Sequence, residues 1–492
     1  MSHKEDFTMD NAELELAKLR AAPITPKIRL QIPPQDMPAQ DPSERRHNMD
    51  EVALGYTPAQ AMLEAERCLQ CKNAPCIAGC PVRIDIPGFI GKVKGGDFLG
   101  AGKIIKKTNL LPSICGRVCP QETQCQAPCT VGKALHSVGK AVQIGRLERF
   151  VADYERTHGA VEVPNVASPT GRKVAIVGAG PAGLTCAADV RREGHDVTIF
   201  EAFHKSGGVM VYGIPEFRLP KVLVQSEAEV LESMGVDFEL NFLVGRTRPL
   251  LSLLREDGYD AVFIGTGAGL PKFMDIPGEN LVGVFSANEY LTRANLLKAY
   301  MKGKAGTPIY PSHRVAVLGG GNVAMDSARM ALRLGAEEVR VLYRRTREEM
   351  PARAEEVEHA IEEGIIFDFL KSPTRVLGDD KGRVAALEVL SYELGEPDDS
   401  GRRRPVPIRG SEEIMPFDTV IVAIGNESNP LISQTTPQLQ VDRHGHIIVD
   451  ERQKTSVERV YAGGDIVLGS ATVILAMGEG RQAAQAINEI LQ

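Results

Sequence analysis

Two strand–turn–helix units with glycine-rich turns constrain the fold of this chain most strongly. The first unit has an apolar run at 174–177, a helical stretch to 193 and a second apolar run at 197–200, joined by Gly178-Ala-Gly180-Pro-Ala-Gly183. The same order recurs at 315–318, Gly319-Gly-Gly321-Asn-Val-Ala324, a helical stretch to 334 and the run 339–342. A buried strand, a glycine turn and a helix leading to a parallel strand form a βαβ unit. The sequence therefore predicts an α/β fold with two Rossmann-like domains.

Most of the cysteines precede both units in the sequence. Nine cysteines occur in the chain, and only Cys186 lies outside the stretch 68–129, in the first helical stretch, where we expect a core residue. The others form the groups Cys68-x2-Cys71-x4-Cys76-x3-Cys80 and Cys115-x3-Cys119-x5-Cys125-x3-Cys129. Eight thiolates suffice for two four-iron clusters, and Cys80-Pro81 and Cys119-Pro120 match the Cys-Pro of bacterial ferredoxin motifs. Zinc is the alternative, because C-x2-C also occurs in zinc knuckles.

Composition limits the class of protein. With 492 residues, the chain has room for about three domains. The formal net charge of -7 does not favour nucleic-acid binding. No apolar stretch reaches the ~18 residues of a membrane span, and no apolar core follows the N-terminus as in a signal peptide. We therefore expect a cytoplasmic protein, in which clustered cysteines bind metal more often than they form disulfides.

The pattern along the chain predicts three units. Residues 1–165 lack alternating strand patterns and should be mostly helical, beginning with a proline-rich arm over residues 1–50 that could wrap a neighbouring domain. Residues 170–305 and 428–492 should form the first nucleotide-binding domain, because strands at 197–200 and 460–462 flank its glycine motifs. Residues 306–427 should form the second.

The two glycine loops predict different ligands. In the first, Glu201 ends the strand after the helix, as expected of an acid that binds a ribose hydroxyl while the loop binds pyrophosphate. In the second, Ala324 replaces the third glycine and the corresponding strand ends in Tyr343-Arg344-Arg345. Arginines at this position suit a 2′-phosphate, so NADP(H) is favoured over NAD(H). Arg347 could assist; the alternative is that the arginines are a solvated strand end.

Iron–sulfur clusters beside two nucleotide sites predict electron transfer. A pyridine nucleotide donates electron pairs and clusters accept single electrons, so a group that handles both, usually a flavin, should lie between them. Gly463-Gly464-Asp465 follows a strand and precedes a helix, where the acid can hold a ribityl hydroxyl or the pyrophosphate of a flavin. No catalytic acid or base is evident, because hydride passes directly between nicotinamide and flavin.

These motifs, in this order, resemble the glutamate synthase small (β) subunit family. That family includes the large subunit of NADH-dependent ferredoxin:NADP oxidoreductase, sulfide dehydrogenase subunits and the N-terminal part of dihydropyrimidine dehydrogenase. The matching text is Arg67-Cys-Leu-Gln-Cys, Cys80-Pro81, Cys115-Gly-Arg-Val-Cys-Pro120, Ile144-Gly-Arg-Leu-Glu-Arg149, Gly213-Ile-Pro, Phe217-Arg-Leu-Pro220, Tyr343-Arg-Arg, Glu349-Met-Pro351 and Ala462-Gly-Gly-Asp465. The resemblance implies a helical domain with two four-iron clusters, then FAD and NADPH domains like those of glutathione reductase.

The resemblance also implies ligands. Cys68, Cys71 and Cys76 would share one cluster with Cys129. The other cluster would take Cys80, Cys119, Cys125 and a fourth ligand, Glu148, for which Glu122 competes; Cys115 would be spare. The FAD contacts implied are Gly178, Gly180, Ala182, Gly183, Glu201, Gly208, Val209, Arg218, Gly464 and Asp465. The NADP contacts implied are Gly319, Gly321, Asn322, Val323, Ala324, Arg344 and Arg345.

The function implied is an NADPH-dependent oxidoreductase subunit within a hetero-oligomer. Electrons from NADPH would pass through FAD and two [4Fe-4S] clusters to a glutamate synthase large subunit. The closest rival is the large subunit of an electron-bifurcating ferredoxin:NADP oxidoreductase, with a small flavoprotein or ferredoxin-type subunit as partner. A third hypothesis is a non-catalytic scaffold or redox sensor with zinc at the cysteine sites.

Overall fold

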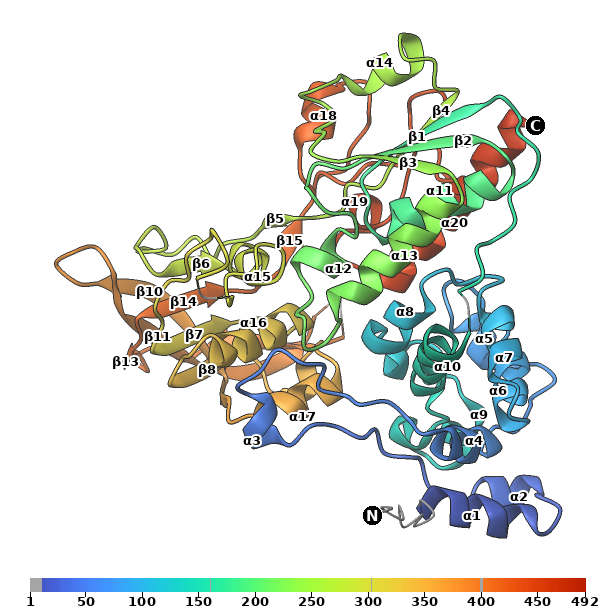
Figure 1. Cartoon of the computed structure of the whole chain (residues 1–492). Helices are drawn as coiled ribbons and strands as arrows, with labels where there is room; N and C mark the ends of the chain where they lie inside the picture. The colour runs from blue at the N-terminus through green and yellow to red at the C-terminus, as the bar shows by residue number, and fades with distance from the viewer. Residues whose placement is uncertain (1–10, 160, 302, 399–400) are drawn as a thin grey trace, which may run out of the picture.

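The computed structural model describes residues 11–159, 161–301, 303–398 and 401–492, and it divides into a helical unit and two sheet-centred units (Figure 1). The helical unit comprises α1 (Asn11–Arg20), α2 (Pro26–Arg29), α3 (Pro42–Arg45), α4 (Pro58–Glu66), α5 (Pro75–Ala78), α6 (Ile86–Lys94), α7 (Phe98–Ile105), α8 (Pro112–Val118), α9 (Thr130–Ala134) and α10 (Ile144–His158), with single 3-10 turns at Gln121–Thr123 and Val138–Lys140. Thr57 and Gln60 form a capping box that starts α4 just before the first cysteine.

The first sheet is parallel and follows the first glycine loop. Its strand order is β16-β4-β1-β2-β3. The strands are β1 (Lys173–Val177), β2 (Asp196–Phe200), β3 (Val236–Glu239), β4 (Ala261–Ile264) and β16 (Val460–Ala462). Helices α11 (Pro181–Arg192) and α20 (Val473–Leu491) pack against each other beside it, and the other helices are α12 (Val209–Tyr212), α13 (Lys221–Ser233), α14 (Leu250–Arg255), α18 (Leu431–Thr435) and α19 (Asp465–Leu468).

The second sheet is also parallel, with the order β6-β14-β7-β8-β9. Its strands are β6 (Val284–Ser286), β7 (Arg314–Leu318), β8 (Glu338–Tyr343), β9 (Ile366–Phe369) and β14 (Thr419–Val422), with helices α15 (Ala287–Asn295), α16 (Asn322–Arg333) and α17 (Ala354–Glu362) and the 3-10 turn Arg347–Glu349. An antiparallel sheet extends this unit: β11 (Val384–Pro397) pairs with β10 (Lys371–Gly378), β12 (Arg403–Pro407) and β13 (Glu413–Pro416).

The chain changes domain earlier than the sequence suggested. The sequence pattern predicts that residues up to 305 belong to the first nucleotide-binding domain, but β6 pairs in parallel with β14 of the second sheet. The crossover is a two-stranded ribbon in which β5 (Leu270–Pro271) pairs with β15 (Asn426–Glu427). A three-residue strand without a glycine motif carries too little signal to mark this change.

A buried network of charged groups joins the units. The arm passes beneath the second sheet-centred unit at α3 (Figure 1), where Arg45 Nε lies 3.0 Å from Glu363. Glu363 also pairs with Arg329 at 2.7 Å. Burial alone would raise the pKa of Glu363, but Arg329 and Arg333 lower it to about 2. The predicted contact of the arm with a neighbouring domain is confirmed at α3, whereas α1 packs against α4 of the helical unit; residues 1–10 lie outside the described residues.

No helix of the described residues is both long enough and apolar enough to cross a bilayer.

Candidate functional site

A single cavity of about 1490 Å³ connects the two glycine loops. Typical ligand pockets measure about 300–1,000 Å³. Its lining includes Gly178, Gly180 and Glu201 of the first unit and Gly319 and Arg344 of the second. The cavity therefore offers room for two dinucleotides that meet in the middle.

The first loop has the geometry of a pyrophosphate site. A Cβ on Gly183 would lie 1.9 Å from the carbonyl oxygen of Gly178, so α11 can approach β1 only with glycine at this position. A Cβ on Gly180, the residue that precedes α11, would meet no described atom within 4 Å. The helix N-terminus therefore opens onto the cavity, as anion binding requires. Ala182 and Gly208 line the same part.

Glu201 lies where the sequence predicted a ribose-binding acid. Its carboxylate accepts hydrogen bonds from the backbone N–H of Ala179, at 2.8 Å, and of Phe203, at 2.9 Å. Burial raises the pKa of Glu201, whereas these backbone hydrogen bonds lower it. Two carboxylate oxygens offer about four acceptor positions, so room remains for a ribose hydroxyl.

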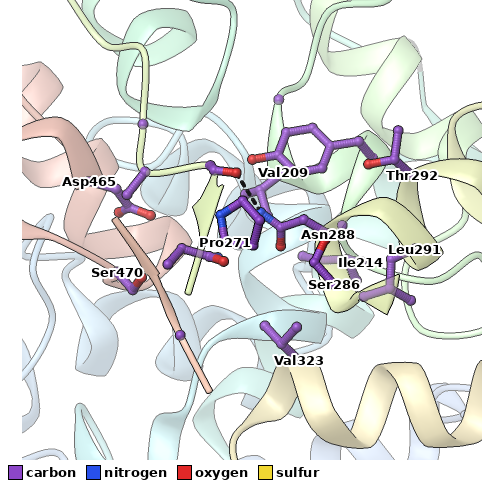
Figure 2. A pocket seen from close by; sticks show the side chains of 18 of the residues that line it. Val209, Ile214, Pro271, Ser286, Asn288, Leu291, Thr292, Val323, Asp465 and Ser470 are labelled. Carbon is purple, nitrogen blue, oxygen red and sulfur yellow. Dashed lines mark hydrogen bonds between the residues drawn. The ribbon is translucent and has the colours of Figure 1, made fainter. Parts of the chain in front are cut away.

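Asp465, which follows β16, borders the cavity together with Val209 from α12 (Figure 2). Burial raises the pKa of Asp465 to about 6. Gly464 does not line the cavity, but its backbone N–H donates to Glu479 Oε2 at 2.6 Å. Glu479 lies on α20 outside any recognised motif, so the sequence does not predict its contact with this loop.

Arg218 lines the cavity, and its guanidinium group is paired with two acidic side chains. Its Nη1 lies 2.7 Å from Asp326 on α16, and its Nε lies 3.4 Å from Glu356 on α17. The proximity of Asp326 and Glu356 raises the pKa of Arg218 despite burial. Arg218 is therefore an ion-pair partner between the two sheet-centred units, a role that its sequence motif does not predict.

The second loop repeats the first with one change. A Cβ on Gly319 would lie 2.3 Å from the carbonyl oxygen of Ala423, at φ +137°. Ala324 is fully buried at the position of the third glycine. Asn322 Oδ1 accepts the backbone N–H of Arg353 at 2.9 Å, and Val323 projects into the cavity (Figure 2). Gly321 also lines the cavity.

The structure separates the two arginines that the sequence grouped. Both border the cavity, but Arg344 is exposed, whereas Arg345 is only 5% exposed. Arg345 Nη2 pairs with Asp398 at 2.7 Å, and its Nε donates to the carbonyl oxygen of Arg403 at 2.7 Å. The expected direct role of Arg345 at a 2′-phosphate conflicts with these contacts. Arg347 is exposed and pairs with Glu358.

Helix α15 supplies part of the central wall, which sequence patterns did not reveal. Ser286, Asn288, Leu291 and Thr292 line the cavity on the side away from Asp465 in the view of Figure 2. Asn288 Nδ2 donates to the carbonyl oxygen of Gly269 at 2.8 Å, which ties α15 to the β5 crossover. No glycine motif precedes α15, so only the packing of the two units places it here.

The first ligand set predicted from the resemblance comes together in space. Cys68, Cys71, Cys76 and Cys129 line one small pocket whose other walls include Ile86, Ile90 and Val142. Burial, and then the charge of Cys68 and Cys129, raises the pKa of the Cys76 thiol to about 12. Four thiols in an apolar pocket are the donor set of a four-iron cluster, and Cys68, Cys71 and Cys76 are partly exposed.

The second set, Cys80, Cys119, Cys125 and Glu148, also comes together in the helical unit. Burial, followed by the charges of Cys119, Glu148 and Cys80, raises the pKa of the Cys125 thiol well above its ordinary value. Burial likewise raises the pKa of Glu148 to about 8, and its Oε1 accepts from Asn109 at 2.6 Å.

The competing ligands differ in their surroundings. Glu122 is partly exposed and pairs with Arg353 at 3.6 Å. Cys115 is fully buried, and its Sγ lies 3.5 Å from Met477 Sδ. Among the described residues, no three histidine, cysteine or acidic side chains converge as ligands of one metal ion. Cluster ligands bind separate irons and stand further apart than those of a single zinc.

Two family models and a solved structure show the class of protein to which this chain belongs. A family model described as pyridine nucleotide-disulphide oxidoreductase matches residues 172–488, and one described as dihydropyrimidine dehydrogenase domain II, 4Fe-4S cluster, matches residues 45–160. Among solved structures, Mycobacterium tuberculosis FprA in complex with NADPH has a TM-score of 0.55 and 20% identity over 65% of this chain and 84% of its own. That likeness shows the fold of the two sheet-centred units.

Curated relatives narrow the class to one family. The glutamate synthase [NADPH] small chain of Halomonas elongata is 39% identical, covering 93% of this chain and 97% of the relative. The Escherichia coli small chain is 37% identical with the same coverage. The NADPH-Fe(3+) oxidoreductase subunit beta of Geobacter sulfurreducens is 37% identical, covering 91% and 68%. The chain belongs to the glutamate synthase small-subunit family and is an NADPH-dependent flavin and iron–sulfur oxidoreductase.

Proposed function

We propose that this cytoplasmic protein carries electrons from NADPH through FAD and two four-iron clusters to a partner subunit. FAD would lie against the first glycine loop, Glu201 and Asp465, and NADPH against the second loop and Arg344. Bound FAD accepts hydride from a nicotinamide and releases single electrons. Residues that line the cavity would orient the two rings and exclude water, and no acid or base is needed for hydride transfer.

One observation carries the proposal: the second cysteine group adjoins the flavin end of the cavity. Val118 and Pro120, the neighbours of Cys119, line the cavity itself. Gln124 Nε2 donates to Thr472 Oγ1 at 3.2 Å, and Thr472 caps the N-terminus of α20 beside the flavin site. Residues on both sides of Cys119 thus connect the helical unit directly with the flavin domain.

The positions of the two cysteine groups support electron transfer from the flavin domain toward the protein surface. Cys119 and Cys125 are buried beside the flavin domain, whereas Cys68, Cys71 and Cys76 are partly exposed. A partner that docks over the first group would meet the cluster at the surface. The named relatives are small or beta subunits, which supports a hetero-oligomer.

We propose a glutamate synthase large subunit as the partner, because the Halomonas and E. coli small chains match nearly their whole length. The rival partner is a small flavoprotein or ferredoxin-type subunit. The beta subunits of the Geobacter NADPH-Fe(3+) oxidoreductase and the Moorella thermoacetica NADP(+)-dependent formate dehydrogenase, 40% identical over 85% of this chain, favour keeping this second candidate.

The proposal is tested first by measuring the cofactor content of the protein and then by adding a partner subunit. Anaerobically purified protein should contain about eight irons and one FAD per chain. It should reduce ferricyanide or viologen dyes with NADPH. It should form glutamate from glutamine and 2-oxoglutarate only after a large subunit is added. A colourless, zinc-loaded protein would refute the redox proposal, and glutamate synthesis by the single chain would refute the subunit proposal.

A further inference from the structure

Arg345 uses its guanidinium to hold a turn instead of facing a ligand. This turn comprises Asp398, Gly401 and Arg402, the described residues between β11 and β12 of the second sheet-centred unit. Arg345 Nη2 pairs with Asp398 Oδ2 at 2.7 Å, and its Nε donates to the carbonyl oxygen of Arg403 at 2.7 Å. The Arg345 side chain is 6% exposed in this pair. The two ends of the turn are therefore fastened to the end of β8, the strand that leads to the ribose position.

This anchoring brings a third arginine to the cavity. The backbone N–H of Asp398 donates to the carbonyl oxygen of Arg402 at 2.8 Å, and that of Gly401 donates to Asp398 at 2.8 Å. The turn is closed by pairing of Pro397 with Arg403. Arg402 then lines the cavity together with Arg344 and Ser372.

We propose that Arg402 and Arg344 together form the 2′-phosphate site, with Arg345 as the positioning residue that fixes the turn. The inference deepens the proposed NADPH function and rests on it. Guanidinium groups from two elements can approach different phosphate oxygens through charge-assisted hydrogen bonds. A ribose 2′-hydroxyl offers no negative charge, so the pair discriminates between the two coenzymes.

Ligand fragments test the role of Arg402 without turnover. Adenosine 2′,5′-bisphosphate and 5′-AMP are titrated calorimetrically into the FAD-loaded full chain. Arg402→Ala should weaken bisphosphate binding by about tenfold or more, the effect of a lost charged hydrogen bond, and leave 5′-AMP binding unchanged. Arg402→Lys keeps the charge and should fall in between. Arg404→Ala, on exposed β12 outside the cavity lining, is the matched control.

The outcomes separate the two proposals. If the wild-type chain binds both fragments equally, the NADPH preference itself is wrong. If it prefers the bisphosphate and Arg402→Ala keeps that preference in a folded protein, the role of Arg402 is wrong. If Arg402→Ala lowers thermal stability, the ratio of the two affinities in Arg402→Lys decides, because misfolding would weaken both fragments alike.

A double-mutant cycle tests how Arg345 acts. Arg345→Ala alone should lower bisphosphate affinity, because the turn loses its anchor. Added to Arg402→Ala, it should cause no further loss, since its effect passes through Arg402. Losses that multiply would show a direct contact between Arg345 and the phosphate and would overturn the positioning role.

Discussion

The ion pair between Arg218 and Asp326 should determine how firmly the two sheet-centred units are joined. The side chains are 7% and 4% exposed, and the closest atoms are 2.7 Å apart. Arg218→Met leaves the Asp326 carboxylate buried near Glu356 without its main partner. Removing one member of a buried pair costs about 3–5 kcal/mol.

That cost translates into a measurable melting shift. One kcal/mol moves the melting temperature of a domain of 150–250 residues by about 2–4 °C, so Arg218→Met should lower the transition of the second sheet-centred unit by about 6 °C or more. Scanning calorimetry of the FAD-loaded chain can follow this transition, identified by its upward shift on adding adenosine 2′,5′-bisphosphate. Arg383→Met removes an exposed pair with Asp379 in the same unit and should shift it by no more than about 4 °C.

The double variant Arg218→Met/Asp326→Leu should recover much of the loss, because no charge is then left without its partner. Additive losses from the two single changes would refute the coupling. A shift in Arg218→Met no larger than that in Arg383→Met would show that the pair does not hold the units together.

Three further changes probe the loop, a buried acid and the clusters. Gly183→Ala places a methyl group 1.9 Å from the Gly178 carbonyl oxygen and should abolish FAD retention in an absorbance assay; Gly306→Ala, whose Cβ meets no described atom within 4 Å, should retain it. Burial raises the pKa of Glu227 to about 7, so the stability of the wild-type protein should fall as the pH rises from about 4.3 through 7. Glu227→Gln should therefore raise the melting temperature at pH 8 but not at pH 4. An equal gain at both pH values would contradict this expectation. Cys119→Ala should halve the iron content by assay, whereas Cys115→Ala should retain both clusters; equal iron loss would remove Glu148 as the fourth ligand.

Much of the candidate site could be read from the sequence because its chemistry lies in short local motifs. The strand–glycine–helix order predicted both nucleotide loops, and the structure has β1–α11 and β7–α16 at those positions. The first cysteine set depended on family resemblance, since spacing alone would have grouped Cys80 with Cys68. Folding instead brings Cys129 to Cys68, Cys71 and Cys76.

Contacts between residues that are distant in the sequence determine the remaining features of the candidate site. Asn288 and Thr292 follow the short strand β6, which carries no motif, and they enter the cavity only because β6 joins the second sheet. Arg345 looks like a ligand next to Arg344, but an antiparallel hairpin more than fifty residues away takes its guanidinium. No local pattern encodes such a contact.

By itself the sequence determined the two Rossmann-like domains, the helical cysteine domain and the residue types at each cofactor, because strand period, glycine turns and thiol spacing are local properties. Only the tertiary structure decided which charged side chains remain available for a ligand. Arg218 and Arg345 are buried against Asp326 and Asp398, because a buried charge must find its partner wherever the fold brings one. The direction of each arginine thus depends on residues far away in the chain.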